Sequence, residues 1–389
     1  MLLRNAKICT ERGVQEGSIL IEDGRIAEVG RHLKAEGESI NLRHLLVLPG
    51  MVDMHVHLRD FTQSRKEDIT SGTSAALAGG VTTCIEMPNT SPPIDSRRAL
   101  RRRLQLASRR AVCDFWAYLG VTRENCTGGE LEGAIAKAYL DGSLGELGYG
   151  ELEQACRSTR LCAVHAEDAG VIAEEGRSRR AELVAVEKVG EIAEHARVHI
   201  CHISLPESLE KLGRATCEVT PHHLLLTEKH GVRVNPPLRS QRDCAALWRA
   251  LADRRIHCIA SDHAPHESRE LPGIPGLETT LPLMLTMVRR GRLSMERLIE
   301  AYSSKPAELL GLESKGGIER GKHADLVVVD PRAEWVIRAD RMHTRAGHTP
   351  FEGWRVRGMV KMTFLRGELV FQDGEVLASP GYGAPVLRL

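Results

Sequence analysis

The sequence lacks an excess of charge of either sign, and it also lacks a long hydrophobic run. Its 389 residues include 53 lysines and arginines against 52 aspartates and glutamates, so the formal net charge is +1. Nucleic-acid-binding proteins usually carry a strongly basic surface, which this balance does not supply. No apolar stretch is long enough to span a membrane, and the first residues lack the apolar core of a signal peptide. We therefore expect a cytoplasmic protein with no nucleic-acid or membrane partner.

CxxC pairs are missing as well. The ten cysteines are scattered, and most lie in apolar, strand-like segments. Disulfide frameworks are typical of short secreted chains, so we expect reduced thiols buried in a core. The composition, with 42% hydrophobic and 27% charged residues, is that of a globular protein. A chain of this length can form one large core or two moderate ones.

Short apolar segments alternate with helical segments through the middle of the chain. Eight strands are predicted, within residues 50–58, 81–89, 113–121, 134–140, 161–168, 198–204, 216–223 and 256–266. Four intervening segments have a helical pattern: 65–79, 97–110, 178–196 and 241–254. Such alternation indicates a parallel sheet, and eight units predict a closed (β/α)8 TIM-type barrel. A doubly wound open sheet is the alternative, but the Gly-rich turn usual after its first strand is missing.

The two ends of the chain have a different pattern. Residues 17–30, 324–337 and 358–376 are predicted strands, and "EDGR" and "QDGE" supply hairpin turns. Neither end is comfortably large enough to form a core alone. We therefore predict one small β-sandwich domain built from residues 1–49 and 317–389, with the barrel at 50–316.

The most basic segment is "RRALRRRLQLASRR", residues 97–110. Its leucines at positions 100 and 104 predict an inward helical face, with the arginines in solvent. We interpret the segment as a solvated helix surface and not as a site for a polyanion.

Two histidines in "VDMHVHLRD" (52–60) have the spacing of a metal site. Side chains two apart on a strand point to the same face, so His55 and His57 can bind one ligand. Asp53 has the same parity and could orient or join them. The pattern alone is weak, because histidines on strands are often hydrogen-bonded within a core.

Further candidate ligands lie at other predicted strands: Lys137, His165, His202 and Asp262. The C-terminal ends of barrel strands meet at one mouth, so these side chains converge with His55 and His57. Zinc accepts imidazole and carboxylate ligands, and this set can hold two ions. Lys137 has two interpretations. Its stem can pack in the barrel with the amine at the rim, or the amine can add carbon dioxide and bridge two metals as a carbamate. From the residues alone the first is favoured.

Several motifs together resemble the amidohydrolase superfamily, and within it the dihydroorotases. They are "DMHVHLRD", "EMPNT", "KAYL", "VHAED", "CHIS", "VTPHH", "VNPPLR", "SDHAPH", "KGGIERGKHADLVVVD" and "GHTPFEGWRVRGMV". The resemblance covers almost the whole chain. It implies interconversion of N-carbamoyl-L-aspartate and L-dihydroorotate in pyrimidine biosynthesis. Hydantoinases and allantoinases, which open other cyclic amides, are the nearest alternative. A non-catalytic structural homologue is a further alternative. Such homologues typically lose metal ligands, whereas every metal-ligand position is filled in this sequence.

The resemblance also implies a role for each site residue. His55, His57 and Asp262 would bind one zinc ion, and His165 and His202 a second. Lys137 would bridge the two ions as a carboxylysine, with Asp141 as the competing residue. A hydroxide between the metals would attack the ring amide, and Asp262 would act as general acid and base.

The remaining implied contacts concern the substrate and the assembly. The resemblance places the substrate carboxylate at Arg59, Asn89 and His266, and a further substrate contact at Asn235. The adjacent His222 and His223 can be either structural residues or ligands. A homodimer and an association with aspartate transcarbamoylase are both compatible with the resemblance.

Overall fold

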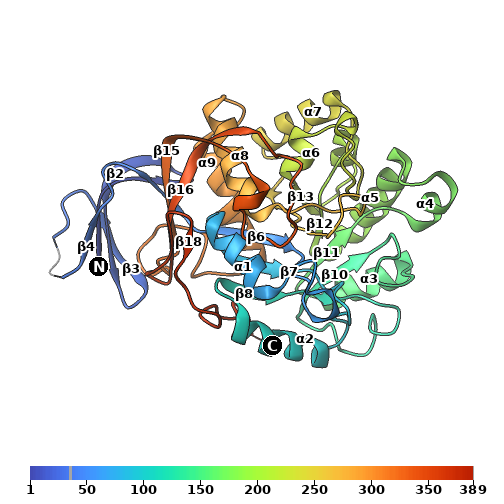
Figure 1. Cartoon of the computed structure of the whole chain (residues 1–389). Coiled ribbons are helices and arrows are strands. Elements are labelled where there is room, and N and C mark those ends of the chain that lie inside the picture. Colours follow the sequence, from blue (N-terminus) through green and yellow to red (C-terminus); the bar gives the residue numbers. More distant parts are fainter. Residues whose placement is uncertain (35–36, 389) are drawn as a thin grey trace.

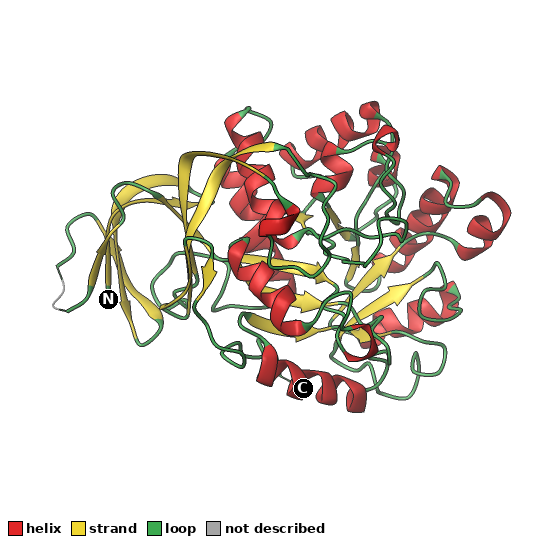
Figure 2. Cartoon of the chain, in the orientation of Figure 1, coloured by secondary structure: helices red, strands yellow, loops and turns green. Residues whose placement is uncertain are grey.

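The computed structural model describes residues 1–34 and 37–388 and divides the strands between a barrel and a separate sheet (Figure 2). The barrel strands are all parallel. They are β6 (Met51–Val56), β7 (Val81–Glu86), β8 (Asp114–Ala117), β9 (Leu119–Gly120), β10 (Ile135–Tyr139), β11 (Leu161–His165), β12 (Val198–Ile200), β13 (Thr216–Val219) and β14 (Cys258–Ile259). Every one of them lies within a segment predicted as a strand.

Strand pairing closes these elements into one barrel of eight positions. β6, β7 and β8 form one sheet, and β9 to β14 pair in sequence order in another. β8 and β9 flank Tyr118 and occupy a single position, which joins the two sheets. A parallel bridge between Val56 and His263, with the His57 N–H donating to the His263 carbonyl at 2.8 Å, closes the ring. The predicted (β/α)8 barrel is confirmed.

Helices surround the barrel, as Figure 1 shows. They are α1 (Ile69–Ala78), α2 (Arg97–Arg110), α3 (Tyr149–Ser158), α4 (Ala169–Glu175), α5 (Arg179–Ala193), α6 (Pro221–Leu225), α7 (Gln241–Ala252), α8 (Leu277–Arg289), α9 (Met295–Ile299) and α10 (Lys305–Leu310). Four of them occupy the segments with a predicted helical pattern. Within the described residues, none of the helices combines the length and the apolar character needed to cross a membrane.

Helix α2 begins and packs as its sequence predicts, with one exception. The Ser96 side chain accepts from the Ala99 N–H and so caps the first turn. Leu100 and Leu104 are buried, as expected. Arg103 is buried too, and its Nε donates to Glu86 of β7 at 2.7 Å. The prediction that all arginines of this segment face solvent is therefore wrong for Arg103, whose charge is compensated by a carboxylate on another element.

The separate sheet contains strands from both ends of the chain, which Figure 1 colours blue and red. Its order is β18-β17-β16-β15-β5-β1-β2-β3, with β4 on β1. The bounds are β1 (Leu2–Thr10), β2 (Gly13–Glu22), β3 (Arg25–Gly30), β4 (Ser39–Asn41), β5 (Leu46–Pro49), β15 (Leu326–Val336), β16 (Arg355–Leu365), β17 (Glu368–Gln372) and β18 (Glu375–Val376). This sheet has its own apolar cluster, which includes Leu3, Ile19 and Phe364. The exact division of the chain at residues 49 and 317 stays a prediction.

Two C-terminal segments leave this sheet and contact the barrel. Beside β8, the Phe115 N–H donates to the Ala384 carbonyl at 3.0 Å, and the Val386 N–H donates to Phe115 at 3.0 Å. At the barrel mouth, His348 Nε2 lies 3.1 Å from the carbonyl oxygen of His266.

All ten cysteines are buried and free, as predicted.

Candidate metal centre and active site

A cavity of about 210 Å³ lies at the C-terminal ends of the barrel strands. Nine of the ten residues predicted for the site line it: His55, His57, Arg59, Asn89, His165, His202, Asn235, Asp262 and His266. Lys137 does not line it, and its side chain is fully buried in β10. The barrel therefore brings together side chains that are spread over more than 200 positions of the sequence.

His55, His57 and Asp262 form the first of two donor clusters. Asp262 Oδ1 lies 3.2 Å from His55 Nε2 and 3.3 Å from His57 Nε2. All three ligand atoms lie within 4.8 Å of one another, as one metal ion requires. Burial lowers the pKa of His55, but Asp262 and Glu218 outweigh this effect and raise it to about 10. These surroundings favour a positive charge at His55 Nε2, and a divalent cation provides one.

His165 and His202 form the second cluster. His165 Nδ1 lies 3.0 Å from His202 Nε2, and the His202 ring lies 5.1 Å from the His55 ring, between centroids. His165 Nδ1 and His202 Nε2 each carry a lone pair when unprotonated. A cation bound by these two nitrogens is one arrangement that satisfies both lone pairs. Burial lowers the pKa of His202 well below its ordinary value, which keeps this ring neutral and able to bind a metal.

Lys137 has an unusual environment for a lysine. Its Nζ donates to Cys201 Sγ at 2.8 Å and lies 5.0 Å from the centroid of the Tyr139 ring. No carboxylate of the described residues forms an ion pair with it. An ammonium ion is costly to bury without an anionic partner. Asp141, the alternative bridging residue, also lines the cavity, where Arg177 Nη2 donates to its Oδ2 at 2.7 Å and His165 Nε2 lies 3.6 Å from the same oxygen.

Glu218 supports the first cluster from β13. Its Oε1 lies 2.5 Å from His55 Nδ1, and its Oε2 lies 3.2 Å from His199 Nε2. Although burial opposes its charge, His55 and His199 lower the pKa of Glu218. A carboxylate at Nδ1 directs the lone pair of His55 Nε2 toward Asp262, which is the orientation that a metal ligand needs.

We expect Glu218→Gln to weaken metal binding about 10- to 100-fold, the usual effect of removing a carboxylate behind a ligating histidine. Competition with a chelator measures the zinc affinity. Glu210→Gln is the control, because Glu210 is exposed and pairs with Arg255 at the surface. Equal zinc affinity in the two variants would contradict the supporting role of Glu218.

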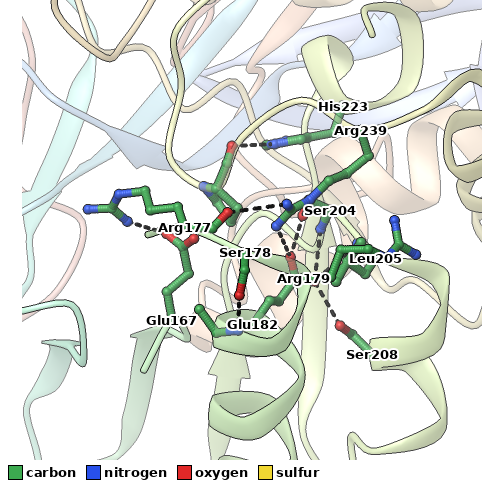
Figure 3. A network of polar contacts seen from close by, with 12 residues as sticks. Glu167, Arg177, Ser178, Arg179, Glu182, Ser204, Leu205, Ser208, His223 and Arg239 are labelled. Carbon is green, nitrogen blue, oxygen red and sulfur yellow. Dashed lines mark hydrogen bonds and ion pairs between the residues drawn. The ribbon is translucent and has the colours of Figure 1, made fainter. Parts of the chain in front are cut away.

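Glu167 and Arg177 orient the second cluster, as part of the polar network in Figure 3. His165 Nε2 lies 2.8 Å from Glu167 Oε2, and Arg177 donates to the same carboxylate oxygen. A proton on Nε2 leaves the lone pair of Nδ1 directed at His202. Arg177 also bonds Asp141, so one guanidinium connects the loops after β10 and β11.

Glu182 holds the loop that follows His202. This buried carboxylate of α5 accepts from the Leu205 N–H at 3.0 Å and the Ser208 hydroxyl at 2.7 Å (Figure 3). Arg239, which follows Asn235, donates from Nε to the Ser204 hydroxyl at 2.9 Å. The network therefore links the loop of a metal-ligand candidate to the loop of a substrate-contact candidate.

Arg59 lies at the cavity among the residues predicted to bind the substrate carboxylate. It is buried, its Nη2 lies 3.1 Å from His266 Nε2, and its Nε has no hydrogen-bond partner. Within the described chain no carboxylate forms an ion pair with it. Asn89 also lines the cavity, although its Oδ1 lies 2.8 Å from His57 Nδ1, so it contacts a candidate ligand as well. A buried guanidinium without a carboxylate is suited to bind a substrate anion.

Other candidates have structural partners. Asp53 does not join the donor clusters, because it accepts from the Ser261 N–H at 3.1 Å and the Tyr302 hydroxyl at 2.9 Å. His223 lies 2.8 Å from the Thr220 hydroxyl and 3.0 Å from the Pro236 carbonyl, at the start of α6. His222 is also buried in α6, away from the lining of the cavity.

Sequence reasoning missed Glu218, Glu167 and Arg177. The available signal for Glu218 is a charged residue inside an apolar segment, "TCEV". The same kind of signal identifies Lys137 in its own segment, "AIAKAYL". Glu167 lies within "VHAED", but nothing in that motif indicates which atom it contacts. No local signal identifies Arg177, because its partners come from two other loops.

Comparisons with known proteins identify the family of this chain. The amidohydrolase family model matches residues 46–370. A dihydroorotase from Pyrococcus furiosus is 39% identical, over 96% of this chain and 93% of its own length, and one from Methanosarcina acetivorans is 34% identical, over 98% and 94%. Among solved structures, the L-hydantoinase (dihydropyrimidinase) from Arthrobacter aurescens is similar, with a TM-score of 0.92 and 30% identity over 100% of this chain and 99% of that one. The chain is therefore a member of the amidohydrolase family, in the branch of the dihydroorotases.

Proposed function

We propose that this chain is a metal-dependent dihydroorotase, which interconverts N-carbamoyl-L-aspartate and L-dihydroorotate. One observation carries the choice of substrate. The guanidinium of Arg59 is buried beside the metal-ligand candidates and has no carboxylate partner within the described chain. Both substrates carry a carboxylate that can pair with it, whereas hydantoin and allantoin carry none.

The donor set fits two zinc ions. His55, His57 and Asp262 would hold one ion, His165 and His202 the other, and a carboxylated Lys137 would contact both. Zinc bound there would polarise the amide carbonyl and make hydroxide available near neutral pH. The buried, uncompensated amine of Lys137 supports the carbamate, because carboxylation exchanges an ammonium for an anionic ligand.

The residues of the chain then divide the remaining work. Arg59, with His266 and Asn89, binds the substrate carboxylate, and Asn235 makes a further contact from the loop after β13. His55 and His57 lower the pKa of Asp262 well below its ordinary value despite its burial, so the carboxylate is ionised at neutral pH and can accept a proton. Asp262 takes the proton of the attacking water and passes it to the leaving ring nitrogen. In the biosynthetic direction it deprotonates the ureido nitrogen.

The test is to measure metal content and turnover on the same preparation. We expect about two zinc ions per chain and hydrolysis of L-dihydroorotate, with cyclisation of N-carbamoyl-L-aspartate as the reverse reaction. Hydantoin and allantoin are assayed in parallel, because the structure is similar to that of the L-hydantoinase from Arthrobacter aurescens. Preferred turnover of either uncharged ring would overturn the substrate assignment, and a metal-free, inactive preparation would indicate a non-catalytic homologue.

Replacing Arg59 tests the carboxylate contact directly. We expect Arg59→Gln to raise the KM for L-dihydroorotate about 10- to 100-fold, as for the loss of a hydrogen bond to a charged group. Any slow turnover of hydantoin should be unchanged, because that ring has no carboxylate. Steady-state kinetics on both substrates measure the effect. Arg101→Gln, on the exposed face of α2, is the control. An equal loss on both rings would contradict the role of Arg59.

A further inference from the structure

Tyr139 lies in the active-site cavity, but none of the roles described above uses its hydroxyl group. It is the last residue of β10, it is 5% exposed, and it lines the same cavity as Arg59 and Asn89. Its ring is stacked beside that of His165, with centroids 6.1 Å apart, and Lys137 Nζ lies 5.0 Å from its centroid. Two residues of the candidate metal centre therefore lie beside this ring.

The hydroxyl of Tyr139 has no hydrogen-bond partner in the described part of the chain. Burial without a partner is unfavourable, because the hydroxyl loses its hydration and receives nothing in exchange. Phenylalanine would keep the packing of the ring without this cost. Most buried polar groups in proteins are paired, so an unpaired donor beside a binding cavity indicates a partner that the chain does not provide.

We propose that Tyr139 is a further substrate-binding residue, and that its hydroxyl donates a hydrogen bond to an oxygen atom of the substrate. This inference rests on the proposed function and extends it. Dihydroorotate and N-carbamoyl-aspartate both carry carboxylate and amide-type oxygens, which accept hydrogen bonds. A phenol is a donor that stays protonated at neutral pH. Arg59 follows β6 and Tyr139 ends β10, so the cavity presents donors to the substrate from two separate strands.

Tyr118 offers a matched control. It lies between β8 and β9, is fully buried, and its hydroxyl also lacks a hydrogen-bond partner within the described residues. However, Tyr118 is absent from the lining of the cavity. Removing its hydroxyl repeats the change in burial and packing without removing a donor from the substrate site.

The experiment compares Tyr139→Phe and Tyr118→Phe with the wild type, all as the metal-loaded protein. For Tyr139→Phe we expect kcat/KM for L-dihydroorotate to fall about 10- to 100-fold, the range for a hydrogen bond to a charged acceptor. Zinc content should be unchanged, and the melting temperature should be equal or higher, because no hydrogen bond within the protein is lost. For Tyr118→Phe we expect unchanged kcat/KM.

Three results would overturn the inference: unchanged kcat/KM in Tyr139→Phe, a fall that is accompanied by loss of zinc or of stability, or an equal fall in Tyr118→Phe. A wild type that does not act on dihydroorotate would instead overturn the proposed function. The ratio of variant to wild-type kcat/KM is then measured with the cyclic amide that the wild type does open, so the two failures are distinguishable.

Discussion

Asp262→Ala is expected to lose turnover almost completely while the barrel stays folded. A general acid and base contributes about 10²- to 10⁴-fold to a rate, and this side chain would also be a metal ligand, so we expect the upper end of that range. Its carboxylate forms ion-pair contacts only with His55 and His57 within the described chain. The fold therefore loses little support. kcat in both reaction directions, thermal unfolding and zinc content measure these outcomes.

A second variant separates proton transfer from metal binding. Asp262→Asn keeps an oxygen atom that can bind a metal, but the amide cannot accept and return a proton. We expect zinc to be retained more fully than in Asp262→Ala, with turnover still close to zero. Activity near that of the wild type in Asp262→Asn would refute the general acid and base role.

The fold was predictable because each barrel strand is a short apolar segment bounded by polar residues. Buried parallel strands have this pattern whatever their partners, so the sequence indicates all eight positions without any contact. Arg103 shows the limit of such reasoning. Helical periodicity assigns a residue to a face by its polarity, and it cannot detect that Glu86, on β7, compensates a buried guanidinium.

The candidate site was predictable to a similar depth. Most residues that would touch metal or substrate lie at or just after strand ends, where position along the chain indicates position at the barrel mouth. Residues that act one contact further away, such as Glu218 behind His55 and Arg177 behind Glu167, depend on side-chain geometry between distant elements. Tyr139 is present in the "KAYL" motif, but only its unpaired hydroxyl together with its place in the lining of the cavity distinguishes it from a packing residue.

Lys137→Ala is expected to lower turnover by about two to three orders of magnitude, because bridging ligands support metal chemistry worth several kcal/mol. Zinc content should fall in parallel. Acetate or another small carboxylate added to the variant should restore part of the activity, since it can occupy the space of the carbamate. Lys137→Arg is the control. It keeps a positive charge and a long side chain but forms no comparable carbamate, so it should stay inactive with or without acetate.

The carbamate itself can be detected on the wild-type protein. Native mass spectrometry should find the additional mass of one carbon dioxide per chain, and isotopically labelled bicarbonate should place the label on Lys137. An active, zinc-loaded protein with an unmodified Lys137 would refute the carbamate. A free ammonium would then lie among a thiol, an aromatic ring and bound cations, with no anion to compensate it. Because such an arrangement is electrostatically unfavourable, that result would also argue against a second metal ion next to Lys137.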